Sequence, residues 1–139
     1  MNTDARQGKS RFRVDIEFRR VQEGPRPSLL FEAKRLGPTS PVSKYLGEDG
    51  LGCFLSGDYP VRQAEAGMLG YIQSQDEDFW ASKIQMSLSD NPTKYALHKD
   101  GRWAREAVIP MLKHTFRTRH LIHGKMSQLT IYHVLLRFC

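Results

Sequence analysis

At 139 residues and 40% hydrophobic content, the chain is long enough for one hydrophobic core but not for two, and no apolar run is long enough to cross a membrane. The net charge of +6 favours a polyanionic partner, and nucleic acid is the commonest one. Two cysteines are too few for a disulfide framework, so we expect reduced thiols in a cytoplasmic protein.

The polar residues 1–10 are expected to form a flexible tail ahead of a single domain over 11–139. In 11–18 apolar residues alternate with charged ones, and 29–34 shows a similar alternation, which is typical of half-buried strands. The stretch between them contains one glycine and two prolines, strong turn residues. The sequence therefore predicts a hairpin.

This hairpin is expected to gather carboxylates and an amine on one face. Glu32 and Lys34 are two positions apart on their strand, so their side chains lie on the same face about 7 Å apart, and Asp15 reaches that face if the strands pair. A Mg²⁺ ion typically binds one or two carboxylates and leaves its other positions to water and phosphate. A neighbouring lysine can hold or deprotonate the attacking water. The alternative is an acid-x-Lys triplet on an ordinary solvated strand.

Asp15 followed by Glu32-Ala33-Lys34 resembles the active-site signature of the PD-(D/E)xK, or restriction-endonuclease-like, nuclease superfamily. The resemblance implies catalysis by Asp15, Glu32 and Lys34. It implies a Mg²⁺ ion, for which Mn²⁺ can substitute, held by Asp15, Glu32 and the backbone carbonyl of Ala33, with Glu17 as a reserve ligand. The expected fold is α/β, with a mixed sheet flanked by helices and a restriction-endonuclease-like core. The run from Tyr45-Leu46-Gly47 to Gly57-Asp58-Tyr59 resembles a connecting segment of some defence-associated members of the superfamily. Arg119-His120, followed by a strand with His133, resembles the tail of the same proteins.

Two features depart from the family pattern. Val14 stands where the family usually has proline before the first acid, and no helix is predicted ahead of the first strand. In the family that helix packs on the catalytic sheet and often supplies another acid. Three explanations stay open: the chain is a fragment, the helix has been lost, or a second copy of the chain or a larger partner chain covers the N-terminal side of the sheet.

The middle of the chain is predicted to be largely helical. Ser40 is expected to cap a short helix that continues over 42–46. Apolar residues at helical spacing predict a helix over 64–72 behind the catalytic strands, although two glycines lie within it. Acidic residues then open a helix at 76–78 that ends before an Asn-Pro pair, and 95–105 is expected to be a loop with some helix.

The last third is predicted to form two strands, 115–122 and 129–138, joined by a turn. Basic residues gather there, and one face is expected to hold backbone phosphates beside the acidic site, through Arg117, Arg119, His120 and Lys125. A zinc site at His120 and His123 is disfavoured because no further ligands complete it. His133, inside an apolar strand, is predicted to be a hydrogen-bonded core residue.

Together these patterns predict a Mg²⁺-dependent nuclease that hydrolyses phosphodiester bonds, with DNA the expected substrate and endo- or exonucleolytic action left open. The alternative is a catalytically inactive nucleic-acid-binding domain of the same fold, and a third reading is a basic interaction module with an accidental motif. No glycine-rich phosphate loop, nucleophile elbow or dinucleotide fingerprint occurs in the sequence.

Overall fold

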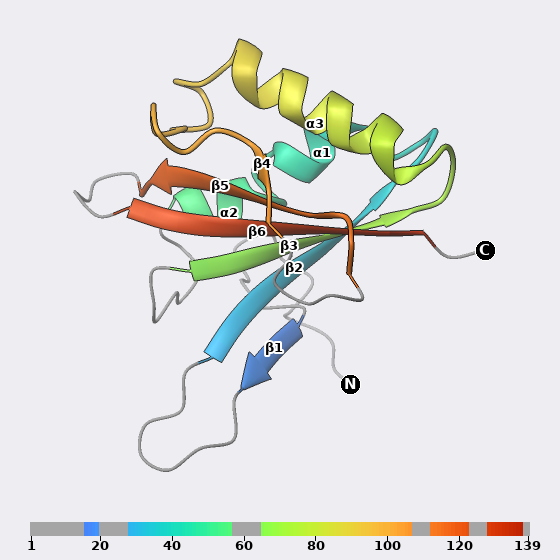
Figure 1. The fold of residues 1–139 in the computed structure, drawn as a ribbon, viewed down its shortest axis with the longest axis horizontal. Helices are drawn as coiled ribbons and strands as arrows, with labels where there is room; N and C mark the ends of the chain where they lie inside the picture. The colour runs from blue at the N-terminus through green and yellow to red at the C-terminus, as the bar shows by residue number, and fades with distance from the viewer. Residues whose placement is uncertain (1–15, 20–27, 57–64, 107–111, 123–127, 138–139) are drawn as a thin grey trace, which may run out of the picture.

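A mixed sheet of six strands forms the centre of the molecule (Figure 1). The computed structural model describes residues 16–19, 28–56, 65–106, 112–122 and 128–137. The strand order within this part of the chain is β1-β2-β3-β6-β5-β4. Its elements are β1 (Ile16–Arg19), β2 (Ser28–Leu36), α1 (Val42–Leu46), α2 (Gly52–Leu55), β3 (Glu65–Ile72), α3 (Glu77–Asp90), β4 (Ala104–Arg105), β5 (Thr115–Leu121) and β6 (Gln128–Arg137). The predicted α/β class is confirmed.

The sheet combines parallel and antiparallel pairs. β1 and β2 pair antiparallel, as do β5 with β6 and β4 with β5, so the antiparallel pairing of both predicted hairpins is confirmed. The predicted tail over 1–10 and residues 11–15 of the first predicted strand lie outside the described residues. The central strands β2, β3 and β6 run parallel to one another. Parallel neighbours need long crossover connections. The β2–β3 crossover contains α1 and α2, and the longer β3–β6 connection begins with α3.

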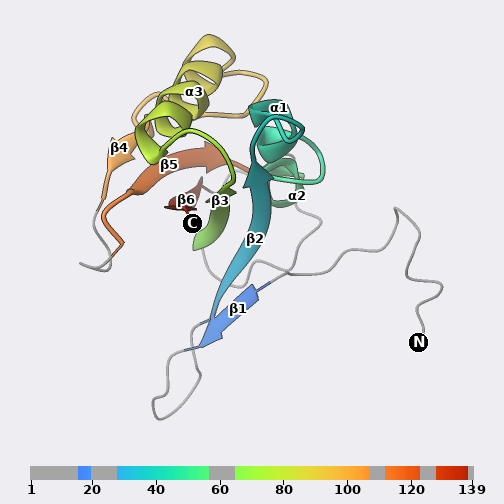
Figure 2. The same cartoon turned by 90° about the vertical axis from the view of Figure 1, so that its right-hand side faces the viewer.

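The helices cover one face of this sheet, which we call the helix-covered face. In Figure 2, α3 lies above β5 and β6, with α1 beside it above the end of β2. All three helices contribute to one cluster of buried apolar side chains together with alternate residues of the strands. Phe31 and Val134, which are also buried, are not part of that cluster, and their register partners Gly67 and Leu69 share the opposite face of the sheet.

Helix α3 is positioned by its cap and its apolar stripe. The Asp76 carboxylate accepts a hydrogen bond from the Phe79 backbone N–H at 2.9 Å, a side-chain N-cap of the kind that stabilises helices by about 1 kcal/mol. Trp80, Ile84 and Leu88 recur at helical spacing and are at most 6% exposed. Burying an apolar side chain of this size stabilises the fold by roughly 1.5–3 kcal/mol, so this stripe anchors α3 to the sheet.

The prediction of a helix over 64–72 is wrong, because this stretch is strand β3. Two glycines weaken a helix there, and both are needed where the strand packs closely. A Cβ atom on Gly67 would lie 2.3 Å from the ring of Phe31, and one on Gly70 would lie 2.8 Å from Leu36 and 2.9 Å from Leu135. Met68 and Ile72 are buried on the helix-covered face, while Leu69 and Tyr71 are half-buried on the other. Apolar residues therefore occupy both faces of β3, and its sequence lacks the period-two alternation.

Smaller differences concern the loops. The stretch 95–105, predicted to be a loop with some helix, instead runs along the edge of β5 and ends in β4, with an isolated bridge between Leu97 and His120. The N-cap position of α1 is Pro41 and lacks a side-chain hydrogen bond, so Ser40 does not cap it. The four-residue helix α2 was not predicted. In the part of the chain that the structure describes, no helix is long and apolar enough to cross a membrane.

Candidate functional site

The Glu32 carboxylate and the Lys34 ammonium form an ion pair on the helix-covered face. Glu32 pairs in register with Met68, which belongs to the buried cluster on this face. Lys34 pairs with Gly70, where a Cβ atom would lie 3.2 Å from the ring of Tyr45 in α1. The Nζ atom of Lys34 lies 3.3 Å from Oε2 of Glu32. The Glu32 side chain is 6% exposed and that of Lys34 is 28% exposed, so Glu32 lies in the interior and Lys34 reaches the solvent. The sequence-based expectation that these two groups meet is confirmed.

A polar pocket of about 420 Å³ begins at Lys34. It lies between the end of β2 and the segment that contains α1, and its walls carry both signs of charge. Its lining residues are Lys34, Arg35, Ser40, Ser43, Lys44, Gly47, Glu48 and Asp49. The ion pair is therefore connected to a solvent-accessible cavity large enough for a small ligand.

Three of the predicted site residues cannot be placed with side chains. Asp15 and Lys125 lie outside the described residues, and Glu17 lies in β1, where only the backbone is described. The backbone of Glu17 pairs with Leu30, and Ile16 pairs with Phe31, the residue that precedes Glu32. The described part of β1 therefore ends one register position short of Glu32.

The expectation that Arg117 and Arg119 flank the acidic site on one face is wrong. Arg117 pairs with Tyr132, which pairs with Gly67, so these positions share the face opposite to Glu32. Two strands, β3 and β6, separate β5 from β2. The Arg117 guanidinium also donates a 2.9 Å hydrogen bond to Glu106. A phosphate bound at Glu32 is out of reach of either arginine, and whether these arginines bind nucleic acid elsewhere stays a prediction.

His120 is a core residue, which corrects its expected surface role. Strand alternation places it on the helix-covered face with Thr118, and both side chains are fully buried. His133 is likewise 0% exposed and hydrogen-bonded, so its predicted core role is confirmed. The signal was available in the sequence, because Thr118 and His120 alternate with the two arginines.

These side chains form a continuous chain of hydrogen bonds, the histidine network. It runs from Tyr45 Oη to His133 Nδ1 (2.8 Å), from His133 Nε2 to Thr118 Oγ1 (2.8 Å), from Thr118 Oγ1 to His120 Nε2 (2.7 Å), and from His120 Nδ1 to the backbone carbonyl of Tyr95 (2.7 Å). A carbonyl oxygen only accepts, so His120 Nδ1 carries the hydrogen. If both rings are neutral, this fixes the donor in each remaining hydrogen bond. The Thr118 hydroxyl donates to His120 Nε2, His133 Nε2 donates to Thr118 Oγ1, and the Tyr45 hydroxyl donates to His133 Nδ1.

The electrostatics of the network agree with neutral imidazoles. Burial lowers the pKa of His120 from 6.5 to about 4, against a smaller opposing effect of its hydrogen bond to Tyr95. Burial also holds the pKa of His133 well below its ordinary value, and proximity to His120 lowers it further. The pKa of the Tyr45 hydroxyl is raised well above 10 by burial. All three groups stay uncharged at neutral pH, and their polar atoms are satisfied.

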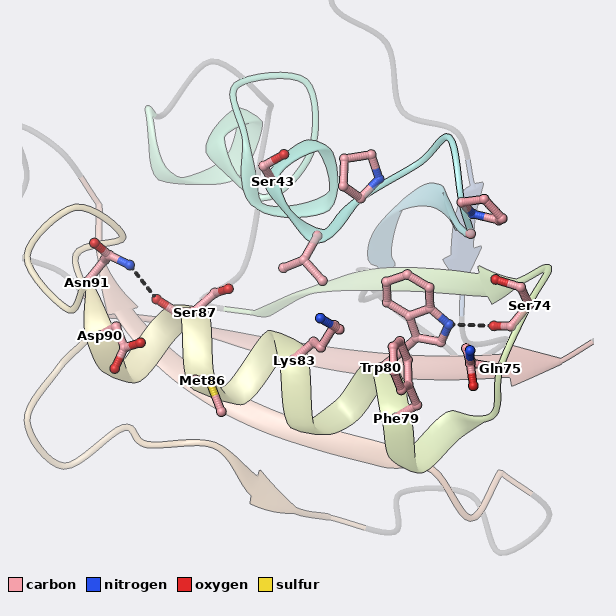
Figure 3. A pocket seen from close by; sticks show the side chains of 14 residues that line it. Ser43, Ser74, Gln75, Phe79, Trp80, Lys83, Met86, Ser87, Asp90 and Asn91 are labelled. Atoms are coloured by element: carbon pink, nitrogen blue, oxygen red, sulfur yellow. Dashed lines mark hydrogen bonds between the residues drawn. The ribbon is translucent and has the colours of Figure 1, made fainter.

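A second, more apolar groove of about 690 Å³ lies between α3 and the loops around α1 (Figure 3). Trp80 forms part of its wall, with its indole N–H donated to the backbone carbonyl of Ser74 at 2.6 Å. Met86, 63% exposed, and Lys83 lie along the same helix. The groove brings together neither paired acids nor a nucleophile with a base, so it offers no catalytic arrangement.

The Glu32–Lys34 pair is the arrangement in the described residues with the clearest chemistry. A carboxylate can bind a divalent cation, and an ammonium beside it can hold water or an anionic oxygen. No group of three or more His, Cys, Asp or Glu side chains suited to a metal occurs among the described residues, which do not include Asp15. Comparison with protein-family models, with curated proteins and with solved structures found no match to this chain.

Proposed function

We propose that the protein is a metal-dependent nuclease that hydrolyses phosphodiester bonds, with DNA as the favoured substrate and a restriction-endonuclease-like core. The observation that carries the proposal is the 3.3 Å contact between Glu32 and Lys34, at the mouth of a polar pocket. The succession β1-β2-α1-α2-β3, with β2 antiparallel to β1 and parallel to β3, supports it, because the acid and the lysine lie on the second strand of that unit.

The proposed metal ligands are Asp15, Glu32 and the backbone carbonyl of Ala33, with Glu17 in reserve. Continuing the antiparallel register by one residue from the Ile16–Phe31 pair would set Asp15 opposite Glu32. Two carboxylates and a carbonyl leave the remaining positions of Mg²⁺ or Mn²⁺ to water and a phosphate oxygen. The ion would stabilise the charge that develops on the phosphate during hydrolysis.

Lys34 is proposed to hold the attacking water and to offset charge on the phosphate. Its ammonium has three donor hydrogens, so the contact with Glu32 leaves donors for a ligand in the pocket. Its partial burial limits screening by solvent, which strengthens an interaction with an anionic oxygen. The residue is thus positioned at the boundary between the buried carboxylate and the pocket.

The decisive experiment compares cleavage by the wild type, Glu32→Gln and Lys34→Met with Mg²⁺ or Mn²⁺ and with EDTA. We expect cleavage to require the metal and each substitution to lower the rate by about 10³-fold, since a positioned catalytic group typically contributes 10²–10⁴-fold. Circular dichroism confirms that the variants are folded. Equal cleavage by folded variants would reject the assignment.

A catalytically inactive nucleic-acid-binding domain is the second candidate. The observation in its favour is the depth of Glu32, whose carboxylate is 6% exposed and already contacts an ammonium, whereas the acids at the pocket rim, Glu48 and Asp49, are exposed. A metal titration separates the two candidates. An inactive domain binds nucleic acid equally with and without Mg²⁺ or Mn²⁺ and leaves it intact.

A further inference from the structure

We propose that the pocket beside Lys34 binds one nucleotide of single-stranded nucleic acid, with its phosphate between Lys34 and Lys44 and its donor groups toward Glu48 and Asp49. This deepens the proposed function, because it rests on Lys34 facing the substrate. It assigns a binding role to residues of α1 and of the turn after it, which the acid-x-Lys motif does not include.

The cationic side of the pocket comes from two different elements. Lys34 and Arg35 lie on β2 and Lys44 on α1, and the hydroxyl-bearing residues Ser40 and Ser43 line the same pocket. Ammonium groups form charge-assisted hydrogen bonds to phosphate oxygens, and hydroxyl groups add neutral ones. Two lysines that converge on one cavity are suited to a single phosphate group.

The pocket lining also carries two acids from the turn after α1. Glu48 and Asp49 belong to a turn in which the backbone N–H of Gly50 bonds to the carbonyl of Gly47 at 3.0 Å. A Cβ atom on Gly50 would lie 2.0 Å from the carbonyl oxygen of Tyr45, so only glycine allows this close approach. Carboxylates accept hydrogen bonds from amino groups of bases and from sugar hydroxyls. A nucleotide carries such donors at one end and a phosphate at the other, which matches a lining with charges of both signs.

The size of the pocket favours single-stranded over double-stranded nucleic acid as its ligand. Its volume of about 420 Å³ suits one small ligand. A base pair inside a double helix keeps its phosphates on the outside and its base edges in the grooves, so it cannot present a phosphate and the donor groups of an unpaired base together to one cavity. Nucleotides of a single strand are free to do so.

The test measures binding by the whole chain in EDTA, so that cleavage cannot interfere. A fluorescent single-stranded oligodeoxynucleotide and the matched blunt duplex are titrated at fixed salt and followed by anisotropy. We expect the single strand to bind at least about 10-fold more tightly than the duplex. Lys44→Ala is expected to weaken binding of the single strand by about 10-fold, the loss typical of a hydrogen bond to a charged group.

Lys99→Ala provides the matched control, because it removes the same charge from an exposed turn that does not line the pocket. It is expected to change the affinity by less than about twofold. Equal losses in Lys44→Ala and Lys99→Ala, or equal binding of single strand and duplex, would overturn the inference. Failure of the nuclease assignment is distinct: cleavage is then absent while the binding pattern holds. Metal-dependent cleavage without an effect of Lys44→Ala rejects the pocket assignment alone.

Discussion

Two polar clusters lie on the helix-covered face, and they differ in charge and in access to solvent. The Glu32–Lys34 pair is ionic and opens onto a pocket, whereas the histidine network is neutral and sealed in the core. In the network every donor meets an acceptor, which is what a buried polar group needs to avoid a large desolvation cost. In the Glu32–Lys34 pair, the Lys34 ammonium has further donor hydrogens and lines the polar pocket. The network is therefore complete without a ligand, whereas Lys34 borders a cavity that a ligand could fill.

The histidine network is connected to the wall of the pocket through helix α1. Tyr45 donates its hydroxyl hydrogen to His133 at 2.8 Å and is fully buried, while its neighbour Lys44 lines the pocket. Helix α1 has only five residues and lacks a side-chain N-cap, so its own hydrogen bonds hold it weakly. The orientation of Lys44 thus depends on the bond between Tyr45 and the sheet.

The largest effect is expected from a substitution within the histidine network. His133→Ala removes a buried ring and leaves the hydroxyls of Tyr45 and Thr118 without their partner, so we expect a loss of about 3–5 kcal/mol in the free energy of unfolding. Urea denaturation measures it. His114→Ala, at a partly exposed position, is the control and should stay within about 0.5 kcal/mol. A loss below about 1 kcal/mol in His133→Ala would show that the network does not stabilise the core.

The next effect depends on pH. The folded pKa of His120, about 4, lies below its ordinary 6.5, so the unfolded chain binds more protons between these values. The stabilisation is complete above pH 6.5 and is lost as the pH falls toward 4, by up to about 3 kcal/mol, since one pKa unit corresponds to ~1.36 kcal/mol. His120→Gln removes this contribution, and its unfolding free energy should fall less between pH 7 and 4. Parallel pH profiles would contradict the burial of a neutral ring.

The smallest effect is expected from substitutions in the Glu32–Lys34 pair. Lys34→Met leaves the Glu32 carboxylate without this partner and is expected to cost about 1–2 kcal/mol, below the loss for a fully buried pair because Lys34 is 28% exposed. Glu32→Gln combined with Lys34→Met should recover part of that loss. A double-mutant cycle from urea denaturation gives the coupling energy. A coupling of zero would mean that solvent screens the pair completely.

Local patterns were sufficient for the hairpins and for α3, but not for β3 or for the relation between distant residues. The alternation in β2 placed Glu32 and Lys34 together, and their contact follows from adjacent positions on one strand. β3 was taken for a helix because its apolar residues are not separated by polar ones. The position of Arg117 relative to Glu32 depends on β6 inserting between β3 and β5, a long-range pairing without a local signature.

The pocket residues were beyond the reach of sequence patterns for a similar reason. Lys44, Glu48 and Asp49 belong to no motif in the sequence, and only the crossover from β2 through α1 brings them to Lys34. His120 is a different case. Its alternation with Arg119 already placed the two residues on opposite faces, so attention to the period of the strand would have assigned it to the core.

The absence of a side chain at Gly67 bears on the position of Glu32, although Gly67 faces the opposite side of the sheet. The ring of Phe31 fills the space where any other residue at position 67 would put its first carbon, 2.3 Å away. Phe31 adjoins Glu32 along the backbone, so even an alanine at Gly67 would push on the strand that carries the acid. Substitutions at Gly67 are therefore expected to disturb the position of Glu32, although the two residues lie on opposite faces of the sheet.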